Sequence, residues 1–190
     1  MSDENIKENI PDKMYKTMAA RFNADNRLRF QHKLANYSIM ILSVYVVILS
    51  ASEKFTGNPL LPFADFSSLC LSVFVIGLAS FEAGNDRLHY AFRLHENALK
   101  INALYQKNIV DSGKNIRDIS EEYSKILAEC EYNHAEIDRH LHIIKNAYIK
   151  NKGYSWVWFL YYCCFEYGFY ILLIVVPPII STVWLLSHFK

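Results

Sequence analysis

Two uncharged, apolar segments on either side of a short loop restrict what this chain can fold into. The first lies between Lys33 and Glu53 and holds 19 residues without a formal charge. As a helix it rises about 28 Å, close to the hydrocarbon thickness of a bilayer. The second lies between Asp65 and Glu82 and holds 16 such residues, about 24 Å, so it needs flanking residues or a locally thinner bilayer. The pattern predicts two membrane spans.

The connection between the two segments predicts a hairpin. It contains two prolines, a glycine and an asparagine, residue types that end helices and turn the chain, namely Gly57, Asn58, Pro59 and Pro62. Two helices joined so closely run antiparallel, and we assign the transmembrane hairpin to residues 34–81. A buried helical hairpin of a soluble protein is the alternative, but both faces of each segment are apolar. A content of 52% hydrophobic residues also favours a membrane protein.

Basic residues before the first segment predict the orientation. Seven of them precede it, whereas the hairpin loop carries only Lys54; they are Lys7, Lys13, Lys16, Arg21, Arg27, Arg29 and Lys33. The positive-inside rule therefore places the amino terminus in the cytoplasm and the loop outside. Residues 1–33 are expected to form a cytoplasmic helix that begins at Pro11 and runs into the first span.

The polar segment 82–152 predicts a cytoplasmic helical domain, which we take as a sensor. Apolar residues at spacings of three and four mark one helix face, namely Leu88, Ala91, Leu94, Ala98, Ile101 and Tyr105. Gly113 is expected to end this helix. A second helix is expected over about 116–130, and a third is expected to be capped by Asn133 and to end near Gly153.

The apolar tail, residues 153–190, predicts a third hydrophobic helix. Its first part is rich in Trp and Tyr, which settle at the membrane interface. We expect residues 154–168 to form an interfacial segment and residues 169–186 a third span kinked at Pro177 and Pro178. This arrangement leaves the carboxyl terminus outside. A re-entrant arrangement that keeps it inside is the alternative.

No motif in the sequence indicates an enzyme. GxSxG, HExxH, Walker and GxGxxG patterns are absent. The four cysteines lack CxxC spacing and are expected to be reduced. His134 and Asp138 share a helix face but have no further metal-ligand support, so we expect no metal and no cofactor.

Repeated cations on the helix after the hairpin suggest a binding site for phosphate groups. The candidates are Arg87, His89, Arg93, Lys100 and Lys107. Such positions suit phosphate oxygens when several subunits converge. The alternative is that they are solvated or hydrogen-bonded helix residues.

Small polar residues inside the two spans suggest either helix packing or a pore. Asn36, Ser43 and Ser50 repeat every seven residues on one face of the first span, and Ser68 and Ser72 share a side of the second. Small hydroxyl residues let helices pack closely in lipid. The functional alternative is that the five residues line a water-filled path. Glu166 is costly near hydrocarbon and is either drawn to the interface or functional.

The order of these segments resembles a known family. An Arg-rich entry to the first span, TMAARFNADNRLRFQHK, is followed by a second span, by ASFEAGNDRLHYAFRLHENALKINALY and by YNHAEIDRHL. Together they resemble the SLATT family of two-transmembrane effector domains, which are associated with nucleotidyltransferase and SLOG sensor proteins. The resemblance covers residues 14–149, and its most specific parts are the Arg-rich entry and the NHxxID pattern at residues 133–138.

The resemblance implies a membrane effector of bacterial antiphage defence. Subunits of such an effector would form a pore in the inner membrane, controlled by a cyclic or linear oligonucleotide signal from a partner nucleotidyltransferase. We therefore expect an all-α membrane protein with a transmembrane helical hairpin, long cytoplasmic helices and a C-terminal third hydrophobic helix. We expect it to be a homo-oligomer, a tetramer, and no enzyme. The rival hypothesis is a non-conducting membrane scaffold that recruits a soluble partner.

Overall fold

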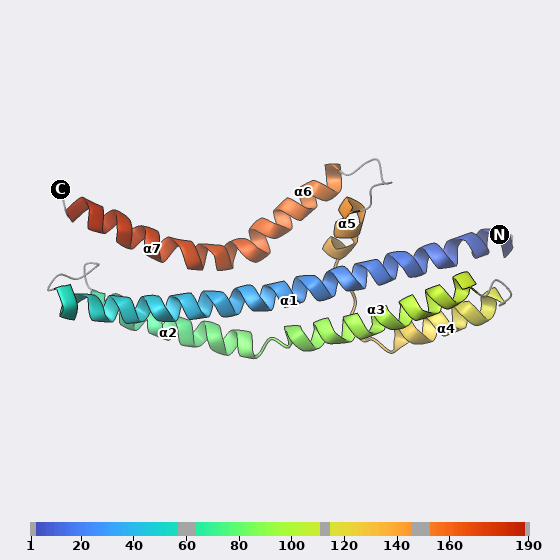
Figure 1. Ribbon diagram of the computed structural model, residues 1–190, viewed down its shortest axis with the longest axis horizontal. Coiled ribbons are helices and arrows are strands. Elements are labelled where there is room, and N and C mark those ends of the chain that lie inside the picture. The colour runs from blue at the N-terminus through green and yellow to red at the C-terminus, as the bar shows by residue number, and fades with distance from the viewer. Residues whose placement is uncertain (1–2, 57–63, 111–114, 146–152, 189–190) are drawn as a thin grey trace. The chain divides into compact units, whose positions relative to one another are not determined.

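All regular structure in the described part of the chain is helical. A computed structural model describes residues 3–56, 64–110, 115–145 and 153–188. The elements in order are α1 (Asp3–Thr56), α2 (Ala64–Ala83), α3 (Arg87–Val110), α4 (Ile116–Ala128), α5 (Glu136–Lys145), α6 (Gly153–Tyr162), the π-helix η1 (Cys163–Tyr167) and α7 (Gly168–His188) (Figure 1). Three helical stretches, Ile10–Ala51, Asp65–Ile109 and Gly153–Val183, contain windows long and apolar enough to cross a membrane. The predicted all-α membrane protein with a third hydrophobic helix is confirmed.

The chain divides into two compact units. Unit 1 consists of Met1–Phe30 and Arg87–Tyr162, and unit 2 consists of Gln31–Asp86 and Cys163–Lys190. Helix α1 begins in unit 1 and ends in unit 2. Each unit has a hydrophobic cluster of its own, so we describe them one at a time.

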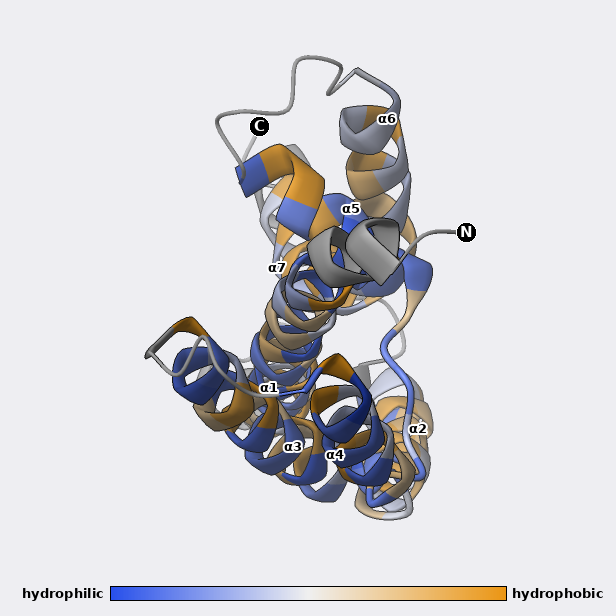
Figure 2. Cartoon of the chain, turned by 90° about the vertical axis from the view of Figure 1, so that its right-hand side faces the viewer, coloured by the Kyte–Doolittle hydropathy of each residue, from blue (hydrophilic) through white to orange (hydrophobic). Residues whose placement is uncertain are grey.

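Unit 1 is built around the first half of α1 with α3 and α4. Its core joins Met14 of α1, Ile101 and Leu104 of α3 and Ile119 of α4, all at most 4% exposed. Figure 1 shows α3 and α4 side by side, and Figure 2 shows hydrophilic turns along both. The predicted apolar face of α3 is largely confirmed, since Ala91, Leu94, Ala98 and Ile101 are buried and Tyr105 packs against the core. Leu88 is the exception at 45% exposed, because it lies in the first turn of α3.

The predicted helix ends agree with the structure only in part. Helix α1 begins at Asp3 and continues through Pro11, where it loses one backbone hydrogen bond and the ring crowds the carbonyl one turn earlier. Helix α4 starts as expected, with the Asn115 side chain accepting from Arg117 N at 3.2 Å, but it ends at Ala128. The terminator expected at Gly113 and the end of the third helix near Gly153 fall on or beside residues 111–114 and 146–152, outside the described residues.

Helix α5 is capped differently from the prediction. It begins at Glu136, not directly after Asn133, whose side chain accepts from the adjacent His134 N at 3.0 Å. The carboxylate of Asp138, in the third helical position, instead reaches back and accepts from Ala135 N at 2.9 Å. This is the second half of a capping box, supplied by Asp where Glu or Gln is usual.

Unit 2 contains the hairpin and the third hydrophobic helix. Helix α2 runs back beside α1 (Figure 1), and Leu42 packs against Val75 and Leu78 in a cluster that Leu173 of α7 joins. Many other apolar side chains of α2 and α7 face outward, for example Val73, Ile76 and Val183 at 62 to 66% exposed. Such outward apolar faces are what lipid would cover.

Helix α7 runs parallel to α1 within unit 2. Three contacts define the direction, because their residue numbers rise together: Gln31 with Glu166, Ser38 with Tyr170, and Tyr45 with Pro177. The expected kink residues, Pro177 and Pro178, lie inside α7, which is one continuous helix. The backbone changes from α-helix to π-helix earlier in the chain, at η1. The Thr182 hydroxyl donates to the carbonyl of Pro178 at 2.8 Å, one turn earlier on the same helix.

Candidate functional site

The cationic residues of α3 lie mainly on one face. At 3.6 residues per turn, His89, Arg93, Lys100 and Lys107 fall within about 40° of one another around the helix. Arg87 points to the opposite side of α3 and is half-buried. The structure therefore groups four of the five predicted ligand residues into a row, which we call the cationic row, and separates Arg87 from it.

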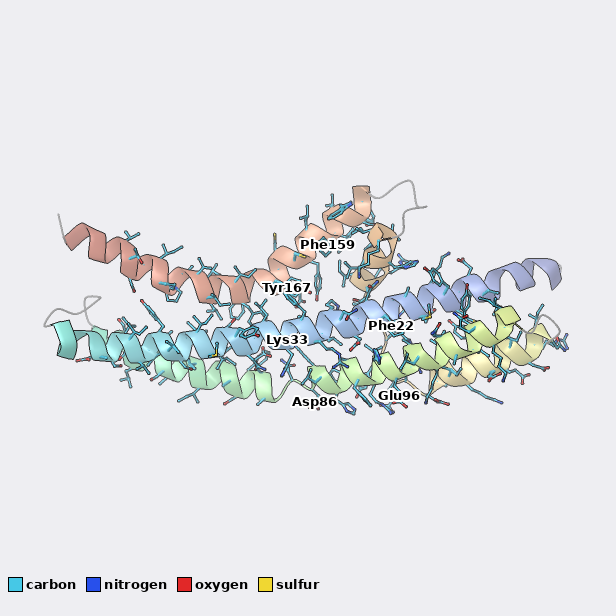
Figure 3. All side chains as sticks on the ribbon, in the orientation of Figure 1. Phe22, Lys33, Asp86, Glu96, Phe159 and Tyr167 are labelled. Atoms are coloured by element: carbon cyan, nitrogen blue, oxygen red, sulfur yellow. The ribbon has the colours of Figure 1, made fainter. Side chains whose placement is uncertain are left out.

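Two carboxylates neutralise the middle of the cationic row. Glu96 lies 3.7 Å from the Arg93 guanidinium and 3.5 Å from the Lys100 amine, and Glu129 at the end of α4 lies 2.7 Å from the same amine. Figure 3 shows Glu96 on the side of α3 away from α1. All four side chains are at least 41% exposed. Exposed ion pairs contribute at most about 1 kcal/mol, so a phosphate group can replace these carboxylates at low cost.

The ends of the cationic row are open to solvent. His89 is exposed and meets the ring of Tyr132 edge-on, with the ring centroids 6.3 Å apart. Lys107 is exposed in the last turn of α3. An aromatic ring beside a basic row suits a ligand that carries both bases and phosphates.

The predicted pore residues of α1 face outward from the chain. Asn36, Ser43 and Ser50 are exposed, and their hydrogen bonds stay within α1. The Ser43 hydroxyl donates to Ile39 O at 2.8 Å and the Ser50 hydroxyl to Val46 O at 3.0 Å. We call these three residues the outer polar row; in the described part of the chain their hydrogen bonds tie them to α1 itself.

The predicted pore residues of α2 lie in a different environment. Ser68 is 8% exposed and its hydroxyl donates to Asp65 O at 2.9 Å. Ser72 is half-buried and donates to Leu69 O at 2.7 Å. Both hydroxyls are satisfied within α2, and the structure does not bring them together with the outer polar row into one surface.

A second polar row on α1 was missed by sequence reasoning. Gln31, Ser38 and Tyr45 also repeat every seven residues, and they form the inner polar row, which contacts η1 and α7. Gln31 Nε2 donates to Glu166 Oε2 at 2.9 Å, and Tyr45 OH donates to Pro177 O at 3.0 Å and also contacts the hydroxyl of Ser181. The heptad spacing was visible in the sequence, but nothing in it names α7 as the partner. Glu166 is thus held by an amide within unit 2.

Unit 1 contains a buried ion pair that the sequence did not reveal. Asp138 is fully buried, and its two carboxylate oxygens accept from Arg27 Nε at 2.8 Å and Nη2 at 3.1 Å. Arg27 Nη1 donates to Tyr162 OH at 2.9 Å, and Asn23 Nδ2 donates to the Asp138 carbonyl at 3.1 Å. This network fixes α5 and α6 to α1, and it occupies the carboxylate that the sequence placed beside His134.

These features define a class of protein. The chain is an all-helical membrane protein in which an apolar hairpin and a third apolar helix accompany a polar helical unit. It belongs to the SMODS and SLOG-associating 2TM effector domain family 5, which it matches over residues 3–185. The match extends past residues 14–149, where the sequence resemblance was placed, and includes most of α7. No curated protein and no solved structure matches the chain.

Proposed function

We propose that this protein is a nucleotide-gated, pore-forming effector of bacterial antiphage defence, located in the inner membrane with its amino terminus in the cytoplasm. Membership of the two-transmembrane effector family supports the effector role and an association with SMODS-type partners. The observation that carries the pore hypothesis is the outer polar row, which is exposed on an otherwise apolar part of α1 and, among the described residues, has hydrogen bonds only within α1.

The outer polar row argues for assembly. Polar side chains that face lipid are unfavourable, and one chain cannot enclose a water-filled path with them. Copies arranged around an axis, four in our proposal, would turn Asn36, Ser43 and Ser50 of each α1 inward. Ser68 and Ser72 of α2 would then lie behind this lining, a secondary role that fits their lower exposure.

The cationic row argues for a phosphate-bearing signal. In this proposal residues 82–152 form the cytoplasmic sensor, and an oligonucleotide made by a partner nucleotidyltransferase binds His89, Arg93, Lys100 and Lys107, with Arg87 contributing from a neighbouring copy. Binding shifts the equilibrium between closed and conducting assemblies in proportion to the difference in affinity for the two.

Ion flux from liposomes tests the pore. Purified protein in liposomes loaded with a fluorescent dye and K⁺ is expected to release K⁺ when a matching oligonucleotide is added. The double substitution Ser43→Leu with Ser50→Leu should abolish release, because it replaces the polar lining with apolar side chains. Thr182→Val is the matched control, since it removes an exposed hydroxyl on α7 that bonds only its own helix. Absence of release by the wild-type protein with every cyclic and linear oligonucleotide tried would favour the scaffold hypothesis instead.

A further inference from the structure

Helix α3 exposes a row of large apolar side chains on the polar unit 1. Among the described residues of α3, four such side chains are 45 to 58% exposed, namely Leu88, Phe92, Leu99 and Ile109. One exposed apolar side chain is ordinary on a protein surface, but these four share one pattern. Apolar groups gathered on one face of a water-exposed unit mark a surface that a partner covers.

All four side chains fit a single seven-residue frame. Leu99 follows Phe92 by seven residues, and Ile109 follows Leu88 by three times seven. Phe92 follows Leu88 by four residues, which is the step from a d position to the next a position of a heptad. At 3.6 residues per turn, Leu88, Phe92 and Leu99 lie within about 40° of one another around α3. We call the four side chains the apolar seam.

The remaining positions of the frame are held by two amides and one histidine, with no Lys, Arg, Asp or Glu among them. They are His95, Asn102 and Gln106. The Nδ1 atom of His95 lies 2.8 Å from Asp25 Oδ2 on α1, so the imidazole is already held inside the chain. Asn102 is half-buried and Gln106 is exposed. An amide both donates and accepts, so two identical amides that face each other across a symmetry axis satisfy each other.

Contacts within the chain use other faces of α3. Leu94 and Ile101 are buried, and Asn97 Nδ2 donates to Ile126 O of α4. The cationic row lies about 100° around α3 from the apolar seam, so it stays open when another helix covers the seam. The seam is therefore a separate surface from the predicted phosphate site.

We propose that the apolar seam packs against the seam of a second copy of this chain, so that the α3 helices of neighbouring copies run parallel. The proposal rests on the assembly of copies in the proposed function, and it names the surface that joins their polar units. The two cations beside the seam, Arg93 and Lys100, are paired with Glu96 and Glu129. Two copies therefore approach each other without net repulsion between like charges.

The composition of the frame favours a second copy over lipid. Lipid offers no hydrogen-bond partner to Asn102 and Gln106, whereas a parallel copy places each amide beside its twin. A heptad seam also needs a partner helix with the same repeat, and α3 of another copy provides one. Copies held in one bilayer have a high effective concentration, so a contact of few side chains is sufficient.

Disulfide formation between copies in native membranes tests the apolar seam. The four native cysteines are first replaced by alanine, and Phe92→Cys or Leu99→Cys is then introduced alone. Oxidation with copper phenanthroline should convert each variant to a covalent dimer, because a positions of parallel helices face one another. Ser124→Cys is the matched control, since Ser124 is exposed on α4 and its hydroxyl donates to Ser120 O on the same helix. We expect at least about fivefold more dimer from the two seam variants than from this control.

Energy transfer between copies that keep their native cysteines gives an independent measurement. Cyan and yellow fluorescent proteins are fused to the amino terminus, which belongs to unit 1. Leu99→Asp should reduce the transfer, because it buries a carboxylate against its twin in the other copy. Ser124→Asp should leave the transfer unchanged. Equal transfer in Leu99→Asp and the wild type would overturn the proposal.

Other results would also overturn it. Equal dimer yields from the seam variants and from Ser124→Cys would mean that the copies meet by random collision. A disulfide with a different protein would mean that a soluble partner covers the seam. Quenching of a fluorophore on Leu99→Cys by nitroxide-labelled lipids would mean that lipid covers it.

A Ser43→Cys variant distinguishes the apolar seam from the proposed pore, because Ser43 belongs to the outer polar row. If Ser43→Cys forms dimers and the seam variants do not, the assembly stands and the seam is not its contact. If only the seam variants form dimers, the seam stands and the pore lining fails. If none of the three forms dimers, the seam and the proposed assembly fail together.

Discussion

At the scale of single residues, Asp138 is the side chain on which unit 1 depends most. Its carboxylate is fully buried and serves both Arg27 and the amino-terminal turn of α5. Breaking a buried pair leaves the other charge uncompensated, at a cost of about 3–5 kcal/mol. We therefore expect Asp138→Ala to lower the free energy of unfolding by about that amount, measured by denaturant titration in detergent.

The control for this prediction is Glu136→Gln. Glu136 starts the same helix, but its pair with Arg139 is exposed and should contribute no more than about 1 kcal/mol. The double substitution Arg27→Met with Asp138→Leu should recover part of the loss, because it leaves no buried charge unpaired. Equal effects of Asp138→Ala and Glu136→Gln would contradict the assigned importance of the pair.

His142 gives unit 1 a sensitivity to acid. Burial lowers the pKa of His142, the charge of Lys16 adds to this and that of Asp12 opposes it. The folded protein therefore holds a neutral imidazole, whereas the unfolded chain takes up the proton near its ordinary pKa of about 6.5. The contribution of His142 to the free energy of unfolding is therefore fully present above that pH. It decreases as the pH falls through about 6.5 toward the lower pKa of the folded state.

We expect the thermal midpoint to fall between about pH 7.5 and pH 5.5, and the fall to be smaller in His142→Leu. The pKa of His134 is lowered for the same main reason, so His134→Gln combined with His142→Leu should flatten the dependence further. If the thermal midpoint of the double variant depends on pH as steeply as that of the wild type, other groups cause the acid sensitivity.

The cationic row is testable by charge reversal. Arg93→Glu with Lys100→Glu places two acids beside Glu96 and Glu129, so oligonucleotide binding should fall at least about tenfold through repulsion alone. Membrane insertion should be unchanged, because both positions are exposed in unit 1. Arg117→Glu, an exposed reversal on α4, is the matched control. Unchanged binding in the double variant would exclude the row as the site.

At the scale of elements, α1 carries two polar rows with different partners. Ser38 and Asn36 differ by two positions, about 200° around the helix, so the inner row contacts α7 while the outer row points away. Hydrogen bonds between membrane helices average about 0.6 kcal/mol and reach about 1.7 kcal/mol. For Gln31 and Glu166, a double-mutant cycle with Gln31→Leu and Glu166→Leu should give a coupling energy in that range.

The cycle is measured by denaturation in mixed micelles. Ser43→Ala, whose hydroxyl bonds only its own helix, should change stability by no more than about 0.5 kcal/mol. A coupling energy of zero for Gln31 and Glu166 would contradict the contact between α1 and η1.

The sequence was most informative where its signals are local. Uncharged length predicted the hairpin, and three- and four-residue spacing predicted the buried face of α3, because both properties act within one helix. It did not reveal the pair of Arg27 and Asp138, which lie 111 positions apart in the chain. It also did not reveal the partner of the inner polar row, since Gln31 and Glu166 lie 135 positions apart. It also missed the cap of α5, because Asn133 is the better N-cap by residue type while the buried Asp138 provides the actual bond.

At the scale of the whole molecule, the parallel direction of α1 and α7 bears on topology. If α1 and α7 both cross the bilayer in the same direction, their ends leave on the same side, opposite the amino terminus. With the amino terminus in the cytoplasm, as proposed above, green fluorescent protein fused to that end should fluoresce. Alkaline phosphatase fused after Lys190 should be active, because it folds only in the periplasm. Fluorescence from a carboxyl-terminal fusion would instead support the re-entrant arrangement of residues 153–190.

The contact between Gln31 and Glu166 also bears on how the protein is made. The chain is synthesised from the amino terminus, so α1 enters the membrane long before η1 and α7 leave the ribosome, and Glu166 follows Gln31 by 135 residues. A carboxylate at the start of an apolar helix hinders its release into lipid. The Gln31 amide, already in place on α1, would lower that barrier by donating to the carboxylate. We therefore expect α1 to be in the membrane before η1 and α7 pack against it.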